Sequence, residues 1–240
     1  MVCRMSDSPK ARDTYSDAIA EANRYTNWIV SQFTPYLGAS TVEIGIGHGS
    51  YIDRLADGRR YAGLDIDPEA VAEAQRKYPS HTFICADLSD AQFAQRVKDR
   101  FDSVVCCNVL EHIAEDQPAV QSLAQLLTRD GHLLLFVPAL PALYGDLDRL
   151  AGHYRRYTRQ ALVTLMDRAQ LEILELRYFN PLGGVGWWLN RALRHQSLNA
   201  TAVNTQIRTF DKWGVPISRM LDPLCRRVFG QSLLCIARRS

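Results

Sequence analysis

Short apolar runs alternate with helical segments through the middle of this chain, and this rhythm restricts the fold more than any other feature. The apolar runs occupy 40–45, 60–65, 81–85, 102–107 and 131–137. Helical patterns lie between them at 50–56, 68–77, 90–97 and 118–127. Strands that alternate with helices form a parallel sheet with helices on both faces. The sequence therefore predicts a doubly wound α/β fold.

The two ends of the chain depart from this rhythm. A helical pattern runs from Asp13 to Tyr36, and residues 139–158 read as a long loop, which at such a length is usually functional. Thr158 is a suitable N-cap for the helix that follows. Two more strands are expected at 171–179 and 232–237. We expect one domain over residues 1–240, with an N-terminal helical segment (1–36), a core (37–180 and 229–240) and a helical cap (181–228).

Charge and cysteine usage exclude several classes of protein. A net charge of +2 is too small to argue for nucleic-acid binding. The six cysteines form no CxxC pair and no zinc spacing, and no segment has the ~20 apolar residues of a membrane span. We therefore expect a cytoplasmic protein with reduced thiols. Cations gather near the C-terminus, where they form a solvated helical face or contact an anionic substrate or lipid surface: Arg208, Lys212, Arg219, Arg226, Arg227, Arg238 and Arg239.

A glycine-rich segment follows the first apolar run and precedes a helix. Its glycines allow a tight turn and a close approach of a ligand to the backbone: Gly45, Gly47 and Gly49. Asp65, at the end of the second run, can accept hydrogen bonds from ribose hydroxyls. The pair predicts an adenosine-type ligand. A dinucleotide fingerprint would place its third glycine at position 50, which is Ser50.

Five segments taken together resemble the class I S-adenosylmethionine-dependent methyltransferases, in the small-molecule branch (methyltransferase type 11/12-like). They occur in the family's order between residues 40 and 138: VEIGIGHG, GLDIDPEAV, CADLSD, FDSVVCCNVLEHI and RDGHLLLFVP. The resemblance implies a seven-stranded, mostly parallel sheet whose last strand is antiparallel, with an N-terminal helix and a helical cap inserted between the last two strands.

The same resemblance implies S-adenosyl-L-methionine as cofactor and gives its contacts. Asp65 would bind the ribose and Asp87 the adenine amino group. The further contacts are expected from Glu43, Gly45, Gly47, Gly49, Ile66, Leu88 and Asn108. Tyr25 and Trp28, on the N-terminal helix, either belong to the core or cover the cofactor, as N-terminal helices do in this family.

Three side chains are candidate catalytic groups: Glu111, His112 and His153. A hydroxyl acceptor needs its proton removed, and either histidine could act as the base. In the coenzyme Q O-methyltransferases a Glu-x-x-Glu-His pattern is associated with a metal. Asn108 stands at the first position here, so we expect no metal. The alternative is that Glu111 and His112 only support the loop.

The acceptor is expected under the long loop and the cap. Candidate contacts are Tyr144, Tyr154, Arg155, Arg156, Tyr157 and Trp187. In this interpretation residues 139–158 form a lid that supplies a base and anion-binding arginines. The alternative is a surface loop with packed tyrosines and solvated arginines. The segment around Trp187 either caps the sheet or receives a hydrophobic acceptor or a membrane surface.

The favoured function is O-methylation of a small molecule, hydrophobic or anionic in character. An N-methyltransferase would share the cofactor residues and need no base. A nicotinamide oxidoreductase and a non-catalytic binding protein remain as alternatives. A nucleic-acid methyltransferase is disfavoured, because no (N/D)PP(Y/F) motif follows the fourth run. The sequence leaves the oligomeric state open.

Overall fold

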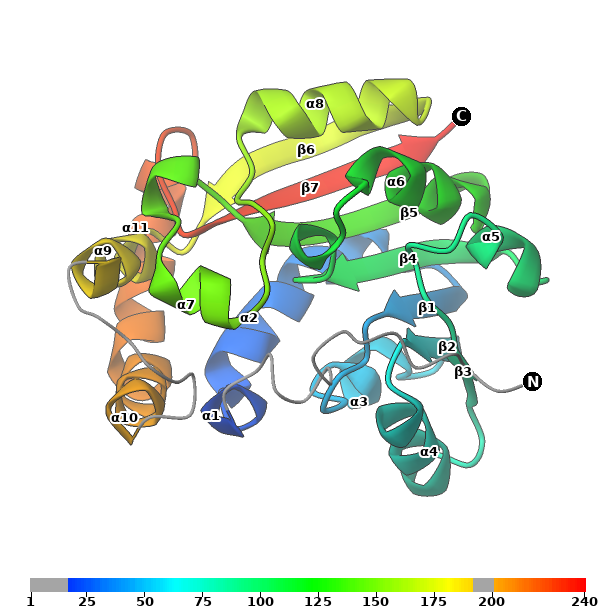
Figure 1. Ribbon diagram of the computed structural model, residues 1–240, viewed down its shortest axis with the longest axis horizontal. Helices are drawn as coiled ribbons and strands as arrows, with labels where there is room; N and C mark the ends of the chain where they lie inside the picture. The colour runs from blue at the N-terminus through cyan, green and yellow to red at the C-terminus, as the bar shows by residue number, and fades with distance from the viewer. Residues whose placement is uncertain (1–16, 192–200) are drawn as a thin grey trace.

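A seven-stranded sheet forms the centre of the molecule in the computed structural model, which describes residues 17–191 and 201–240 (Figure 1). The strands are β1 (Ser40–Ile44), β2 (Arg60–Asp65), β3 (Thr82–Cys85), β4 (Phe101–Cys107), β5 (Leu127–Pro138), β6 (Leu171–Phe179) and β7 (Ser232–Arg239). Their order across the sheet is β3-β2-β1-β4-β5-β7-β6. β7 runs antiparallel to both of its neighbours, β5 and β6, and the other four strand pairs are parallel. The predicted fold, including the antiparallel last strand, is confirmed.

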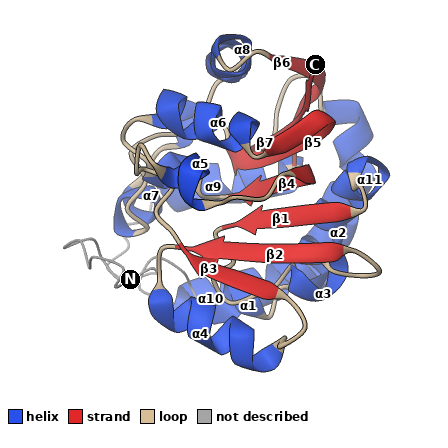
Figure 2. Ribbon diagram, turned by 90° about the vertical axis from the view of Figure 1, so that its right-hand side faces the viewer, coloured by secondary structure: helices blue, strands red, loops and turns tan. Residues whose placement is uncertain are grey.

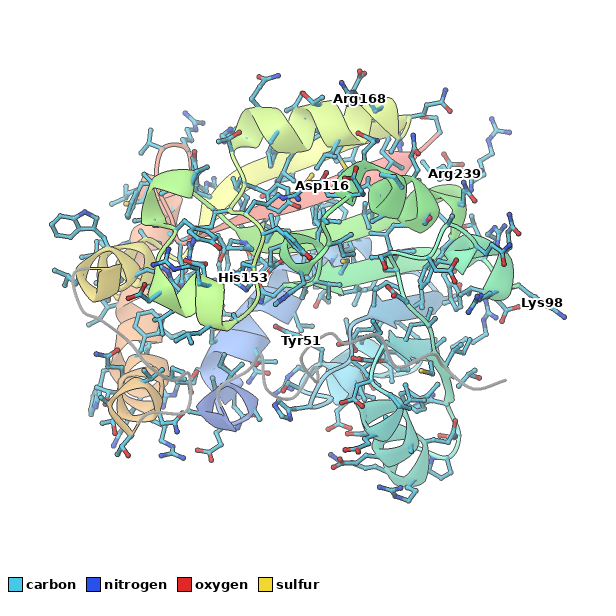
Figure 3. The ribbon with its side chains drawn as sticks, in the orientation of Figure 1. Tyr51, Lys98, Asp116, His153, Arg168 and Arg239 are labelled. Atoms are coloured by element: carbon cyan, nitrogen blue, oxygen red, sulfur yellow. The ribbon has the colours of Figure 1, made fainter. Side chains whose placement is uncertain are left out.

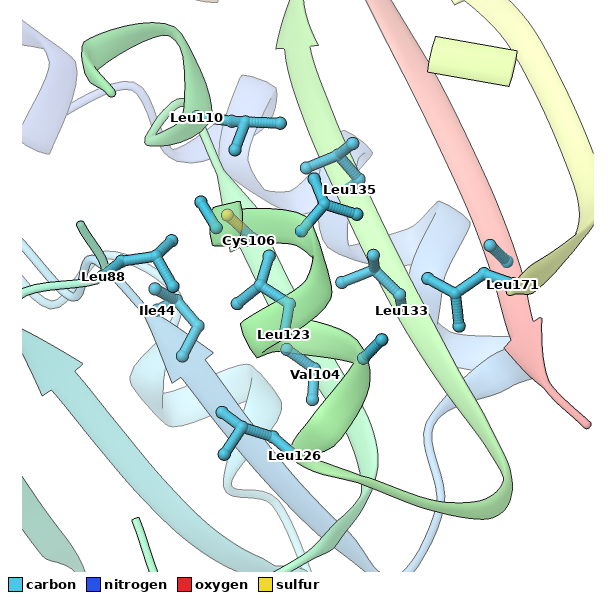
Figure 4. Packing of buried hydrophobic residues seen from close by; sticks show 14 of the residues in the cluster. Ile44, Leu88, Val104, Cys106, Leu110, Leu123, Leu126, Leu133, Leu135 and Leu171 are labelled. Carbon is cyan, nitrogen blue, oxygen red and sulfur yellow. The ribbon is translucent and has the colours of Figure 1, made fainter. Parts of the chain in front are cut away.

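The central strands are apolar on both faces because helices cover both. Val104 and Leu135 point into one buried cluster, which helices α5 (Phe93–Arg96), α6 (Asp116–Gln125) and α8 (Arg159–Arg168) cover (Figure 4). Their chain neighbours Val105 and Phe136 point into the opposite cluster. Helices α2 (Asn23–Phe33), α3 (Ile52–Leu55) and α4 (Pro68–Lys77) supply the other face. Figure 2 shows the two helical layers with the sheet between them.

Local capping defines two of these helices. The Asp67 side chain accepts the backbone N–H of Glu69 at the start of α4, where Pro68 occupies the first turn. The Thr158 hydroxyl accepts the N–H of Ala161 at the start of α8, as the sequence predicted.

Two predicted segments differ from the structure. The helix expected from Asp13 is interrupted after α1 (Asp17–Ala20), and α2 begins at Asn23; residues before 17 lie outside the described part. Residues 139–158 are not one long loop. They contain the 3₁₀ turn η4 (Pro141–Leu143) and helix α7 (Asp146–Leu150). Asp148 explains the second difference, because its carboxylate accepts the N–H of Gly145 and so caps α7.

A helical cap connects β6 to β7, as predicted. It consists of α9 (Pro181–Arg191), α10 (Thr201–Thr209), the π-helical turn η5 (Phe210–Gly214) and α11 (Val215–Cys225), and it lies beyond the carboxyl ends of the parallel strands (Figure 1). Asp222 of α11 anchors it by accepting from the Arg177 guanidinium (3.0 Å) and the Asn180 backbone (3.1 Å). The division into a core and a cap as parts of one domain stays a prediction.

Candidate functional site

The carboxyl ends of β1 and β4 enclose the point where the strand order reverses. From β1 the chain continues to β2 on one side, whereas β4 lies on the other. Open α/β sheets bind ligands in the crevice at this position. The glycine loop follows β1 here, and Asp65 and Asn108 stand at or just beyond the ends of β2 and β4.

The glycine loop depends on backbone geometry that side chains would prevent. Gly45, Gly47 and Gly49 all have positive φ angles, of 78°, 48° and 74°. A Cβ on Gly45 would stand 2.4 Å from the Val109 side chain, so the loop fits tightly against the segment after β4. The three glycines of the sequence motif therefore determine the path of this loop.

Asp65 connects the loop to the end of β2. One carboxylate oxygen accepts the N–H of Gly47 at 2.9 Å, and the other accepts the N–H of Asp67 at 2.8 Å. Burial raises the pKa of this carboxyl, against the lowering effect of those hydrogen bonds. Each oxygen can accept more than one hydrogen bond, so Asp65 retains capacity for ribose hydroxyls. Ile66, next in the chain, exposes 40% of its surface at the same edge.

Glu43 lies beneath the loop in β1. It is buried, and its carboxylate accepts the Tyr61 hydroxyl at 2.5 Å. Burial raises the pKa of Glu43 to about 8, with a smaller contribution from the charge of Asp65. The Oε1 atom has no hydrogen-bond partner within the described protein. Such an atom is costly unless a ligand or solvent satisfies it.

The adenine candidates lie after β3 and β4. Asp87 accepts the N–H and the hydroxyl of Ser89, at 2.8 and 2.6 Å. The Leu88 side chain is buried in the core (Figure 4), which leaves its backbone for a ligand. Asn108 has a positive φ of 52°, and its N–H donates to Phe136 O at 2.8 Å.

The N-terminal aromatics are core residues to different extents. Trp28 is 3% exposed and packs on Phe179 with ring centroids 4.0 Å apart. Little of its surface remains for a ligand, and its expected contact with the cofactor stays a prediction. Tyr25 is partly buried and contacts the rings of Phe136 and Phe210. Burial raises the pKa of Tyr25 to about 12. Its role toward a cofactor stays a prediction.

On the other side of the crevice, Glu111 is a fully buried carboxyl in the 3₁₀ turn η3 (Leu110–His112). Neither of its carboxylate oxygens has a hydrogen-bond partner among the described residues. Burial raises the pKa of Glu111 to about 7, although the positive charge of a protonated His153 would oppose the shift. A group that changes protonation near neutral pH is common in catalytic sites.

His153 and Asp148 form an oriented pair beside this carboxyl. The two are joined by a 3.0 Å hydrogen bond between Nδ1 and Oδ1. Because an ionised carboxylate only accepts, Nδ1 carries the proton and the neutral ring keeps Nε2 as an acceptor. Nε2 lies 3.9 Å from Glu111 Oε1. Figure 3 places His153 beside α7, next to the segments after β4 and β5.

Arg156 and Trp187 hold Asp148 in place. The Arg156 guanidinium donates to Asp148 at 2.9 Å, and the Trp187 indole N–H donates to its other oxygen at 3.3 Å. Burial acts to raise the pKa of Asp148, but the hydrogen bond from His153 and the charge of Arg156 hold it below its usual value. Arg156 is itself buried. Its charge is paired with Asp148, and its expected role in binding an anionic acceptor stays a prediction.

The remaining lid residues divide into inward and outward groups. Tyr157 is buried, and its hydroxyl donates to Asp116 Oδ2 at 3.0 Å. Its assignment to the acceptor site stays a prediction. Arg155 pairs with the same carboxylate at 2.7 Å. Tyr144 donates to the carbonyl of His153 at 2.7 Å. Tyr154 is 62% exposed, so among these it has the most surface for an acceptor.

The lid-side cluster also has the composition of a metal site. Glu111, His112 and His153 each offer one ligand atom, and these atoms all lie within 4.8 Å of one another. One carboxylate and two imidazoles suit zinc or a similar divalent ion. Burial lowers the pKa of His112 to about 4, so its ring is neutral at physiological pH. The expectation of no metal stays a prediction.

Sequence reasoning missed Asp148 and Asp116. Asp148 orients the candidate base, and Asp116 fixes both Arg155 and Tyr157. The only signal for Asp148 was an acid five positions before His153 in the suspected lid. Such a spacing predicts no contact unless the intervening chain forms a turn.

Comparisons with known proteins agree with this arrangement. The family model of a methyltransferase domain matches residues 42–135. Ubiquinone biosynthesis O-methyltransferases are similar to this chain. The Ralstonia nicotianae protein is 27% identical over 201 residues, which cover 76% of this chain and 80% of that protein. The Haemophilus ducreyi protein is 25% identical over 68% of this chain and 78% of its own length.

Solved structures share the fold. A methyltransferase from Archaeoglobus fulgidus superimposes with a TM-score of 0.60 at 14% identity, covering 90% of this chain and 94% of that chain. An N-methyltransferase from Bradyrhizobium japonicum, solved with S-adenosyl-L-homocysteine, has a TM-score of 0.55 at 16% identity and covers 98% and 93%. Among the described residues, no helix is both long and apolar enough to cross a membrane.

Proposed function

Since the chain belongs to the class I S-adenosylmethionine-dependent methyltransferases, we propose that it methylates a hydroxyl group of a small molecule with His153 as general base. The observation that carries the proposal is the Asp148–His153 pair, whose second ring nitrogen faces the buried Glu111. The ubiquinone biosynthesis O-methyltransferases that resemble the chain support a hydroxyl acceptor.

The glycine-loop side fits the cofactor. The loop can let a ligand approach its backbone, Asp65 retains acceptor capacity, and Glu43 Oε1 is a buried carboxyl oxygen without a partner, whose ionisation a nearby ammonium would favour. These features suit the ribose hydroxyls and the methionyl ammonium. Ile66, Asp87, the Leu88 backbone and Asn108 complete the proposed binding set. When bound, S-adenosyl-L-methionine supplies a methyl group on a positively charged sulfonium.

The lid side supplies the proton chemistry. The acceptor hydroxyl would donate to His153 Nε2, which would take its proton. The bound cofactor would supply the methyl group to the acceptor oxygen, and its sulfur would keep the electron pair of the broken carbon–sulfur bond. Asp148 would stabilise the imidazolium through its bond to Nδ1, and an ionised Glu111 would add a second negative charge 3.9 Å from Nε2. General-base catalysis of this kind contributes about 10²–10⁴ in rate.

Glu111 and His112 have supporting roles in this proposal. With its pKa raised to about 7, Glu111 can share the proton that His153 removes. His112 has its pKa lowered to about 4 and packs against the His153 ring with centroids 4.6 Å apart. It would therefore confine the base rather than replace it.

The acceptor is proposed to be a hydroxyl compound of hydrophobic or anionic character, bound beside Tyr144, Tyr154 and Trp187. The partly exposed face of Trp187 offers an apolar contact near the base. A cytoplasmic location is part of the proposal, because the five cysteines of the described chain are free thiols.

An acceptor competition tests the proposal. The protein would be incubated with methyl-labelled cofactor and matched pairs of aromatic compounds that differ only in a hydroxyl or an amino group. We expect labelled methyl ethers from the hydroxyl compounds and no labelled product from the matched amines. Labelled N-methyl products, with a rate that is flat above mildly acidic pH, would instead identify an N-methyltransferase.

A further inference from the structure

The last cap helix, α11, has an apolar outer face in addition to the face that packs on the molecule, although a surface helix needs an apolar face only where it packs. Its inner face packs on the molecule through Val215, Ser218 and Asp222. Its outer face carries large exposed apolar side chains at spacings of mostly three and four residues: Ile217, Met220, Leu221 and Leu224. Trp213 in η5 and Val228 in the turn after the helix are exposed as well. Met220 and Leu224 are each 79% exposed. Packing within the described molecule does not account for the apolar side chains on this outer face.

In residues 211–228 the acidic side chains are used inside the molecule, whereas the basic side chains are exposed. Of its two acids, Asp211 accepts the N–H of Tyr25 at 2.8 Å, and Asp222 is paired with Arg177 at 3.0 Å. Both carboxylates are thus used inside the molecule. The cations are all exposed: Lys212, Arg219, Arg226 and Arg227. The outer side of residues 211–228 therefore presents positive charge with no exposed carboxylate to balance it.

Helical geometry places these groups in separate stripes. At about 100° per residue, the four outer apolar side chains of α11 fall within a sector of roughly 100°. Arg219 lies on one flank of that sector, and Lys212 and Arg226 stand just before and just after the helix. An apolar face beside a basic flank is the pattern of helices that lie in the plane of a membrane interface, with the cations at the headgroups.

We propose that the outer face of α11 docks this protein on the surface of an anionic lipid bilayer. The apolar side chains would enter the boundary between headgroups and acyl chains, and the cations would pair with anionic headgroups. The absence of a spanning helix in the described chain is compatible with surface attachment. Helix α9, which packs on α11 in the cap, has further exposed apolar residues, Val185, Trp188 and Leu189.

A second copy of the chain fits this face less well than a bilayer. A stable dimer commonly buries about 1,200–2,000 Å² in total, which is more than one face of a short helix provides. The same face of a second copy would also present cations and no free carboxylate. Anionic lipid satisfies both the apolar stripe and the charge.

Vesicle flotation with the full chain tests the proposal. We expect the protein to float with vesicles of phosphatidylglycerol and phosphatidylcholine, and to remain unbound with phosphatidylcholine alone. The double variant Met220→Ser/Leu224→Ser and the triple variant Lys212→Gln/Arg219→Gln/Arg226→Gln should each lower the apparent affinity at least about tenfold. The charge variant should also show a weaker dependence on salt.

Matched variants away from the cap serve as controls. Val163→Ser/Leu174→Ser removes two partly exposed apolar side chains, and Arg76→Gln/Lys98→Gln/Arg129→Gln removes three exposed cations. Both should float like the wild type. Binding of S-adenosyl-L-homocysteine to every variant checks folding. No flotation, equal flotation with neutral vesicles, or full flotation of both α11 variants would overturn the proposal. A wild-type dimer that Met220→Ser/Leu224→Ser dissociates would assign the face to a second copy.

Discussion

The two sides of the crevice are built in different ways. The glycine-loop side is formed by backbone geometry: three glycines with positive φ and one carboxylate that accepts two backbone N–H groups. The lid side is formed by side chains that come together from β4, the lid and the cap, with Asp148 at the centre of four hydrogen bonds.

This difference indicates a division of labour. A backbone cradle binds a ligand of constant shape, whereas a side-chain network sets proton affinities and can vary with the acceptor. On the first side, removal of a group should weaken cofactor binding. On the second, it should change turnover and leave cofactor affinity intact.

Loss of the base should have the largest effect. We expect His153→Ala to lower kcat by about 10²–10⁴, because no other group can take the hydroxyl proton in the same position. The dissociation constant of S-adenosyl-L-homocysteine, measured by calorimetry, should change less than about twofold. Added imidazole should restore part of the rate, which a merely structural histidine would not allow.

His132→Gln serves as the matched control, since His132 lies on β5 beside Tyr36, six residues before the end of the strand at Pro138 that leads into the lid. A His153→Ala variant with normal kcat would refute the assignment of proton transfer to the lid side.

Substitution of Asp148 by Asn should lower kcat less than loss of His153, because the imidazole ring remains but is less well oriented.

Asp65→Ala should produce the second largest effect, on binding. The variant loses a buried charged acceptor and releases the Gly47 N–H. A hydrogen bond to a charged group contributes about 1.5–3 kcal/mol, so affinity for S-adenosyl-L-homocysteine should fall by about 10- to 100-fold. Calorimetry of wild type and variant measures this loss, and NADH should bind to neither.

Asp67→Ala is the paired control. It removes the N-cap of α4, which should cost about 1 kcal/mol of stability. The affinity of this variant for S-adenosyl-L-homocysteine should remain near that of the wild type. If both variants lose affinity equally, Asp65 acts only by supporting the loop.

Glu43 should give a smaller effect, on stability. Its pKa is raised to about 8 in the folded protein from an ordinary value of 4.5, so the folded state holds the proton more tightly. Glu43 therefore contributes most to the stability of the folded state below pH 4.5, and this contribution is lost as pH rises toward 8. Relative to wild type, Glu43→Gln should gain stability on the order of a few kcal/mol between pH 5 and pH 8.5.

Urea unfolding at the two pH values measures this difference. Glu69→Gln, an exposed acid on α4, should track the wild type at both. A Glu43→Gln variant whose relative stability does not depend on pH would mean that Glu43 is ionised in the folded state.

Chelation should have the smallest effect. If His153 is the base, exhaustive EDTA treatment should leave turnover within about twofold of the untreated enzyme. Loss of activity that zinc or magnesium restores would assign Glu111, His112 and His153 as metal ligands instead. Cofactor binding should be unaffected in either case, because the glycine-loop side contains no ligand of that cluster.

The sequence by itself determined the framework of this protein. Alternating apolar runs and helical patterns predicted the parallel sheet, because local periodicity reflects which faces must be buried. The glycine motif and the Asp65 position predicted one side of the crevice, since a tight turn needs glycine at particular positions. The resemblance to a methyltransferase family added the antiparallel last strand, which no local pattern dictates.

Only the tertiary structure decided which polar side chains meet. Arg156 and Tyr157 looked like acceptor contacts, yet they turn inward to Asp148 and Asp116, while Tyr154 beside them faces solvent. Neighbouring residues in a lid diverge in this way because their directions depend on how the chain bends around α7. The partnership of Asp148 with His153, and the burial that raises the pKa of Glu111, depend on packing between segments distant in the sequence.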